Sequence, residues 1–267
     1  AHVATLASVT ALIIMGQHTG SFYVVAFFRF VLVMIGVLSS SIVNLIFLPP
    51  KFETKIYYNS MNISSDIFVW FKLVLNDTSE FHNIKQDGDQ LNSRINKLEK
   101  IFDYYNEERP LTKKHIYQQN RKKILFREVV RTTRQAYEVL KRMSRYQNDL
   151  YQLNNQLLLQ IKLELDSLVT LHEQIFKSLS KKARYDVTQL DYEVDNPQKK
   201  NLMDAFQQEL IKNPHQTQYS YSNMMQIIAE IEEYRYQLEH LDRIRLSFFT
   251  YHRSDTDIDI SDEDFDL

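Results

Sequence analysis

Polar side chains that could act on a solute lie along one otherwise apolar stretch of the chain. Gly36, Ser40 and Asn44 follow one another at intervals of four residues, which places small and polar groups on one side of a helix. An amide group in apolar surroundings is costly unless it has a hydrogen-bond partner or borders water. Two interpretations follow: close packing against another helix, or the border of a transport pathway. Arg29, the charged residue nearby, either reaches out to water or faces a polar cavity that would attract an anion.

A second group of side chains could attract anions by charge alone. Between residues 109 and 145 the chain carries 12 Lys or Arg residues but only two Glu. Arg127, Arg131 and Arg134 recur at helical spacing. We define the basic face as Arg121, Lys122, Lys123, Arg127, Arg131, Arg134, Lys141, Arg142 and Arg145. Three roles stay open for it: salt bridges to acidic helices, contact with anionic lipid, and nucleic-acid binding, which the sequence favours least.

The motifs of common enzyme classes are missing from the sequence. There is no cysteine, and the eight histidines form no HExxH pair. No GxSxG elbow or phosphate-binding GK[ST] motif occurs, and only four glycines are available for such loops. We therefore predict a protein that is not an enzyme, with no catalytic residue, cofactor or metal site. His172 interrupts an apolar seam, and we interpret it as a core residue with a hydrogen-bond partner rather than as a ligand.

The chain that positions these groups divides into two parts of very different composition. Of the 66 Asp, Glu, Lys and Arg residues, only Arg29 lies within residues 1–50. Residues 30–48 form an uncharged run of 19 residues, and a helix of that length spans about 28 Å, close to the hydrocarbon core of a bilayer. The two prolines at 49 and 50 would end this transmembrane helix. Residues 3–15 are apolar but short for a span, so we expect a truncated sequence that begins inside an earlier helix.

The rest of the sequence predicts a helical bundle and a charged tail. Lys51 and Lys55 directly follow the span, so the positive-inside rule places residues 51–267 in the cytoplasm. Apolar residues at heptad spacing indicate amphipathic helices with seams like those of coiled coils. The expected segments are a helix over 51–76, seams over 91–105, 158–179 and 224–241, a helix from 112 to about 149, a short helix between 200 and 213, and connections over 186–200 and 213–222.

The overall prediction is an all-α protein in three parts. Residues 1–50 would be the C-terminal part of a transmembrane domain, and residues 51–253 a cytosolic antiparallel helical bundle. Residues 254–267 would form a disordered acidic tail, because from residue 255 onward they hold seven acids and no base. We expect this tail to shield the basic face within the same chain.

The segment from Arg29 to Glu53, RFVLVMIGVLSSSIVNLIFLPPKFE, resembles the end of the membrane domain in the bacterial aromatic acid exporter family. That family is related to the fusaric acid resistance transporters. The residues that carry the resemblance are Arg29, Gly36, Asn44, the Pro49-Pro50 pair and Glu53. The later segment EEYRYQLEHLDRI is similar to part of the family's cytosolic domain, and the resemblance reaches to about residue 252.

The resemblance implies a multi-pass exporter of aromatic carboxylic acids or related organic anions in the bacterial cytoplasmic membrane. It implies a homo-oligomer in contact with membrane lipid. Arg29 would pair with a carboxylate, Asn44 would hydrogen-bond it, and the basic face would raise the local concentration of anions. The alternative function is a membrane-anchored helical scaffold or sensor that binds a protein, lipid or nucleic-acid partner without transport.

Overall fold

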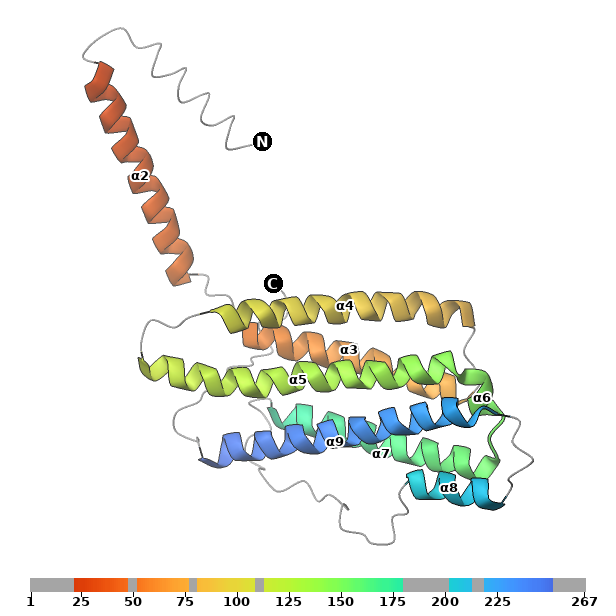
Figure 1. The fold of residues 1–267 in the computed structure, drawn as a ribbon. Coiled ribbons are helices and arrows are strands. Elements are labelled where there is room, and N and C mark those ends of the chain that lie inside the picture. Colours follow the sequence, from red (N-terminus) through yellow and green to blue (C-terminus); the bar gives the residue numbers. More distant parts are fainter. Residues whose placement is uncertain are drawn as a thin grey trace. The chain divides into compact units, whose positions relative to one another are not determined.

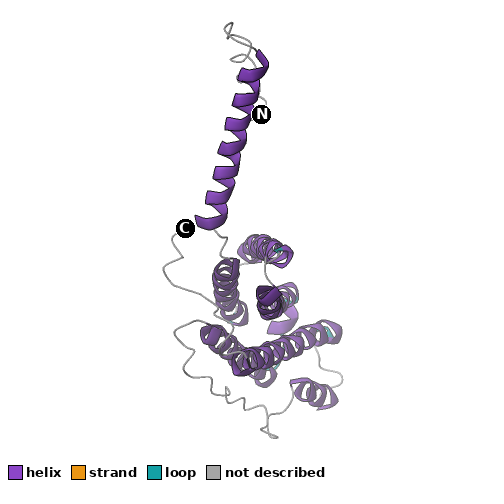
Figure 2. Cartoon of the chain, turned by 90° about the vertical axis from the view of Figure 1, so that its left-hand side faces the viewer, coloured by secondary structure: helices purple, strands orange, loops and turns teal. Residues whose placement is uncertain are grey.

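The structure, a computed structural model of the 267-residue chain, describes residues 22–47, 52–76, 81–108, 113–179, 202–212 and 219–251. Every regular element in these ranges is a helix, which confirms the all-α prediction (Figure 2). The chain divides into two units, residues 1–51 and 52–267. The expected helix over 3–15, the proline stop at 49–50 and the acidic tail lie outside the described residues.

The first unit contains α2, Phe22–Phe47, a helix of 26 residues. Its large apolar side chains are exposed along the helix, with exposed fractions of 83% at Tyr23, 64% at Phe27 and 66% at Leu32. In the part of the chain that the structure describes, no helix is long and apolar enough to cross a membrane. The predicted span over 30–48 stays a prediction, and its last residue and the side chains of residues 42–47 lie outside the described part.

In its described residues the second unit is a bundle of five long helices and two short ones (Figure 1). The long helices are α3 (Phe52–Leu75), α4 (Phe81–Glu107), α5 (Lys113–Arg145), α7 (Asn155–Leu179) and α9 (Tyr221–Tyr251), and the short ones are α6 (Gln147–Tyr151) and α8 (Leu202–Lys212). Each helix that the apolar spacing predicted in this unit is present.

Ion pairs and hydrogen bonds between α3 and α4 show the relative direction of these two helices. Arg94 of α4 pairs with Asp66 of α3, and Tyr105 bonds to Glu53, so α3 and α4 run antiparallel. Helix α5 packs against α3, α4 and α9, whereas α7 packs against α9, α8 and α3 (Figure 1). These contacts place α5 at the centre of the bundle, where its side chains meet three neighbouring long helices.

The apolar seams predicted from spacing form the core. In α9 the seam residues Met224, Ile227, Ile231, Tyr234, Leu238 and Leu241 are all fully buried. The five seam residues of α4 are likewise buried, at 9% exposure or less. Burying such side chains contributes roughly 25 cal/mol for each Å² of apolar surface removed from water, so these seams are the main source of stability.

Two predicted boundaries differ from the structure. The helix expected to reach about residue 149 ends at Arg145, and α6 follows after a turn at Tyr146. The connection expected over 213–222 ends earlier, because α9 begins at Tyr221. Asp149 of α6 contacts the start of α9: its carboxylate accepts hydrogen bonds from the backbone N–H of Ser220 at 2.8 Å and from Asn223 Nδ2 at 2.7 Å, which supplies the start of α9 with a cap from a distant segment.

Candidate functional site

The predicted stripe on α2 lies on an exposed helix surface. Arg29 is half-buried and Ser40 is exposed, while the side chain of Asn44 lies outside the described part. A Cβ atom added at Gly36 would meet no atom within 4 Å. Arg29 and Ser40 are about 16 Å apart along the helix, so the stripe is a line of groups rather than a closed pocket. Its role in packing or in transport stays a prediction.

Arg134 and Arg142 of the basic face are held by side chains of neighbouring helices. Arg134 donates to Glu99 of α4 through Nε at 2.9 Å and Nη2 at 2.8 Å, a bidentate pair. Arg142 donates to Glu230 Oε1 of α9 at 3.2 Å and to Gln226 Oε1 at 2.9 Å. These two arginines therefore connect α5 to the helices on either side of it.

Lys122 and Lys123 are held at the end of the bundle where α3 begins. The Nζ atom of Lys123 donates to the backbone oxygens of Asn106 at 2.7 Å and Glu108 at 2.8 Å, which satisfies carbonyl groups at the end of α4. Burial lowers the pKa of Lys123, and the nearby Glu108 carboxylate opposes this change. Lys122 Nζ lies 3.1 Å from Glu53 Oε2.

Glu53, which the family resemblance singled out, bridges two helices at this end. Its Oε1 atom accepts a hydrogen bond from the Tyr105 hydroxyl at 2.9 Å, while Oε2 accepts from Lys122 of α5. Burial raises the pKa of Tyr105, and the negative charge of Glu53 raises it further. The neutral phenol is therefore a permanent donor to the Glu53 carboxylate.

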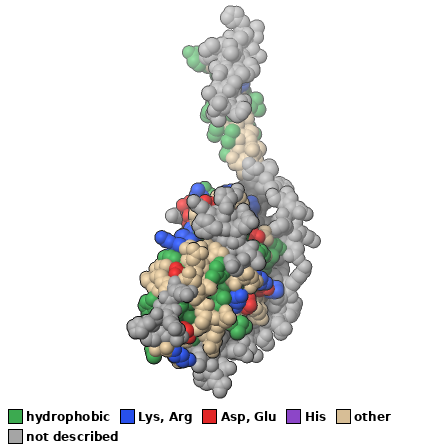
Figure 3. Space-filling view, turned by 90° about the vertical axis from the view of Figure 1, so that its right-hand side faces the viewer, with side chains coloured by type: hydrophobic (Ala, Val, Ile, Leu, Met, Phe, Trp, Pro, Cys, Tyr) green, Lys and Arg blue, Asp and Glu red, His purple; other side chains and the backbone are tan. Residues whose placement is uncertain are grey.

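The remaining members of the basic face are more open to solvent. Arg131 and Lys141 lie near Glu128 and Glu138 of their own helix, and Arg127 is exposed. Arg121 and Arg145 lie over tyrosine rings, at 4.1 and 5.6 Å from the ring centres. Acidic and basic side chains are interspersed on the surface in Figure 3. The structure thus distributes the nine residues over several surroundings rather than in one continuous cationic patch.

His172 has the hydrogen-bond partner that the sequence predicted. Its Nδ1 atom lies 2.8 Å from the Tyr234 hydroxyl, and its ring stacks on Phe176 at 4.4 Å between ring centres. The side chain is 1% exposed, and burial lowers the pKa of His172 to about 3. At neutral pH it is therefore an uncharged core residue. Within the described residues no group of His, Asp and Glu side chains could hold a metal ion.

A buried ion pair in α9 was not predicted from the sequence. Asp242 and Arg245 are 0% and 1% exposed, and Arg245 Nε donates to Asp242 Oδ1 at 2.7 Å. Asp242 Oδ2 and Arg245 Nη2 have no partner among the described residues. The sequence did carry a signal, because the seam spacing that ends at Leu241 continues to residue 245, where it places a charge in an apolar position.

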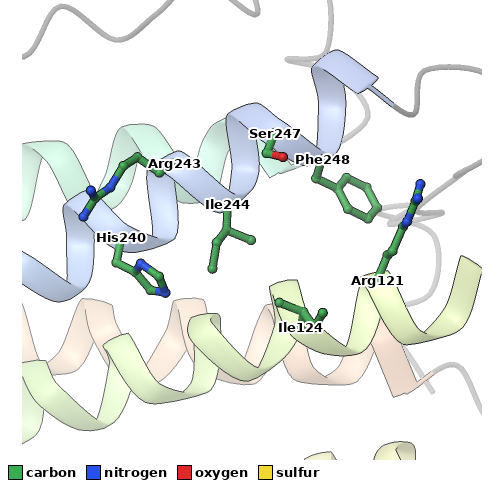
Figure 4. Close-up of a pocket in the computed structure, with 7 residues that line it drawn as sticks. All are labelled: Arg121, Ile124, His240, Arg243, Ile244, Ser247 and Phe248. Atoms are coloured by element: carbon green, nitrogen blue, oxygen red, sulfur yellow. The ribbon is translucent and has the colours of Figure 1, made fainter.

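A pocket between α5 and α9 was also missed. It has a volume of about 460 Å³ and is lined by Arg121 and Ile124 of α5 and by His240, Arg243, Ile244, Ser247 and Phe248 of α9 (Figure 4). Arg121 belongs to the basic face, but Arg243 comes from a helix whose sequence showed no basic cluster. Only the packing of α5 against α9 brings them together.

Comparison with known proteins finds a relative that matches nearly the whole chain. The chain is 34% identical over 260 residues to the UPF0421 protein YgaE of Bacillus subtilis (strain 168), and the match covers 97% of this chain and 72% of that protein. No family model matches the chain. No solved structure matches it either.

Proposed function

The chain belongs to the UPF0421 family, and we propose that it is a membrane protein that exports aromatic carboxylic acids or related organic anions from the cytoplasm. The resemblance of residues 29–53 to aromatic acid exporters supports the transport function. In this proposal the protein is a homo-oligomer in the bacterial cytoplasmic membrane, with residues 51–267 in the cytoplasm, and it needs no cofactor or catalytic residue.

The observation that carries the proposal is the surface of α2. Large apolar side chains are exposed along this helix, from Tyr23 to Leu38, and the one charged residue among them is Arg29. Contiguous apolar surface of this extent usually marks contact with lipid or with another protein surface. In a membrane domain, lipid and neighbouring helices would cover this apolar surface. Covering it avoids the free-energy cost of exposing apolar surface to water, about 25 cal/mol for each Å².

Arg29 and Asn44 are the proposed substrate contacts. A guanidinium forms bidentate hydrogen bonds with a carboxylate, and an amide adds a further donor. Gly36 and Ser40 lie between them on the same side of the helix and leave room for a flat ring or for a neighbouring helix. The exposed members of the basic face would attract anions to the cytoplasmic side of this path.

An efflux assay tests the proposal. Cells that produce the full-length protein are loaded with a panel of aromatic acids, and the rate of efflux is compared with that of Arg29→Ala and Asn44→Ala cells. We expect at least a tenfold loss in each variant, because a charge-assisted hydrogen bond contributes roughly 1.5–3 kcal/mol. Wild-type efflux from folded variants would show that the assigned contacts are wrong.

The α5–α9 pocket favours one alternative, a membrane-anchored sensor that binds a small ligand in its bundle without transport. Its cavity of about 460 Å³ falls within the usual range of roughly 300–1,000 Å³ for small-molecule sites. Deletion of the gene distinguishes the two functions. Unchanged efflux and unchanged tolerance of aromatic acids in the deletion strain would favour the sensor.

A further inference from the structure

We propose that the pocket between α5 and α9 binds amphipathic organic anions, meaning molecules with a carboxylate on an apolar body. The site belongs to the helical bundle alone and does not depend on α2. The proposal therefore goes beyond transport, and it holds whether or not the protein is an exporter.

The charge of the pocket selects an anion. Arg121 and Arg243 both line it, and no carboxylate occurs in its described lining. Arg243 forms no ion pair with the residues that the structure describes, and its Nε atom makes a long hydrogen bond of 3.4 Å to the backbone oxygen of Glu239. Arg243 therefore brings a positive charge to the lining of the cavity, which an incoming carboxylate would neutralise.

The middle of the pocket selects an apolar body. Ile124 of α5 and Ile244 of α9 lie between the two helices, and Phe248 points toward Arg121 (Figure 4). Ile124 is 47% exposed although it lies next to the buried Phe248, which is 4% exposed. Covering this apolar surface contributes roughly 25 cal/mol per Å², so a ligand with a ring or short chain gains more here than an inorganic anion.

Two of the side chains that line the pocket are held by contacts within their own helices. Arg121 lies over the Tyr117 ring at 4.1 Å and donates to the Tyr117 hydroxyl, which restricts its side chain. At the other end of the pocket His240 stacks on Tyr236 with an angle of 5° between the rings. Side chains that are already ordered lose less entropy on binding, which favours affinity.

The two cationic ends flank the apolar middle. Arg121 and Phe248 lie at one end of the pocket, and His240 and Arg243 lie at the other, with Ile124, Ile244 and Ser247 between them (Figure 4). A flat molecule with one acidic group can place that group at either arginine and its ring on the isoleucines. Naphthalene-2-carboxylate has this form and serves as the probe.

Equilibrium dialysis of labelled naphthalene-2-carboxylate against the full-length protein in nanodiscs of zwitterionic lipid tests the proposal. We expect saturable binding that weakens about tenfold in Arg243→Gln and in Arg121→Gln, since each loses a charge-assisted contact. Lys100→Gln is the matched control, because it removes an equal charge from an exposed position on α4 away from the pocket. Its affinity should equal that of the wild type.

Further binding measurements distinguish the contribution of the pocket's shape from that of its charge, and they show which class of acid binds best. Ser247→Trp keeps every charge but fills the exposed rim of the cavity, so it should abolish binding while circular dichroism shows an intact bundle. The neutral naphthalene-2-carboxamide should bind at least tenfold more weakly than the acid. Competition by salicylate or by decanoate then shows whether soluble aromatic acids or fatty acids are preferred.

The proposal is overturned by any of three results. These are no saturable binding to the wild type, wild-type affinity in Arg243→Gln and Ser247→Trp, or equal affinity for the acid and the carboxamide. Failure of export with binding retained would reject the exporter function only, and export with no binding would reject the pocket only.

Discussion

The two ends of the interface between α5 and α9 differ in the surroundings of their arginine side chains. At the end near residue 142, Arg142 is held by Glu230 and Gln226. Gln226 also accepts a hydrogen bond from the Tyr146 hydroxyl at 3.1 Å, so the polar groups there have partners within the bundle. At the other end, Arg121 and Arg243 border an apolar cavity without a carboxylate in its described lining.

This difference distinguishes cations that stabilise the fold from cations that could bind a ligand. A paired arginine that connects two helices contributes to the stability of the folded state, because its ion pair is lost on unfolding. Its removal should therefore lower the free energy of unfolding. Arg243, beside the cavity, should contribute little to the fold, because it forms no ion pair with the residues that the structure describes and its Nε atom makes a long hydrogen bond of 3.4 Å to a backbone oxygen. Positive charge in the sequence is therefore a poor guide to an anion site until the partners of each side chain are known.

Breaking the buried pair of α9 should have the largest effect. Arg245→Met leaves the Asp242 carboxylate buried without its partner, and we expect a loss of about 3–5 kcal/mol in the free energy of unfolding. The double variant Asp242→Leu with Arg245→Met should recover most of this loss, because no buried charge remains. Urea denaturation followed by circular dichroism measures both. A small effect of Arg245→Met alone would show that the pair is hydrated.

Acid should destabilise the bundle through His172. Its pKa is about 3 in the folded protein and about 6.5 when unfolded, so above pH 6.5 the residue is neutral in both states. As the pH falls from 6.5 toward 3 only the unfolded state takes up the proton, and each pH unit costs about 1.4 kcal/mol of stability. His172→Gln cannot titrate and should flatten the loss of stability between pH 6.5 and 5 by about 2 kcal/mol. Equal pH slopes in the two proteins would contradict this account.

Removing the paired arginine should affect stability but not ligand binding. Arg142→Ala and Glu230→Ala are each expected to cost roughly 1–2 kcal/mol, with a coupling energy near 1 kcal/mol in the double-mutant cycle, since the pair is partly exposed. Naphthalene-2-carboxylate should bind Arg142→Ala with wild-type affinity. If Arg142→Ala lost as much affinity as Arg243→Gln, the proposed difference between the two ends of the α5–α9 interface would be wrong.

Changing the pocket end should have the smallest effect on the fold. Arg243→Gln is expected to shift the free energy of unfolding by less than about 0.5 kcal/mol, because this exposed side chain makes one long hydrogen bond and no ion pair with the residues that the structure describes. The same preparation should show the tenfold loss of affinity. A large destabilisation would reveal a structural role for Arg243 that its contacts do not indicate.

The helices of the bundle could be predicted from the sequence because their apolar spacing is regular. Leu91, Ile95 and Leu98 of α4 are buried as that spacing requires. The contact between Asp149 of α6 and the start of α9 could not be predicted, since Asp149 and Ser220 lie 71 residues apart in the sequence. Helical spacing records which side of a helix faces the core, but it does not record which partner that side meets.

The candidate sites were less predictable for the same reason. The basic face was identified as a set of charges, yet Arg134 and Lys123 are engaged by groups on α4, which no local pattern reveals. The pocket needs Arg121 and Arg243 to meet across two helices that are distant in sequence. His172 was interpreted correctly, because a polar residue at a seam position must find a partner in the core.

Release of naphthalene-2-carboxylate from proteoliposomes tests the central claim most directly. The full-length protein is reconstituted in vesicles loaded with the labelled acid, and empty vesicles and Arg29→Ala vesicles serve as references. The exporter proposal predicts that wild-type vesicles release the acid at least tenfold faster than empty ones and that Arg29→Ala vesicles do not. Release at the same rate from all three preparations, with folded protein in the membrane, would contradict it.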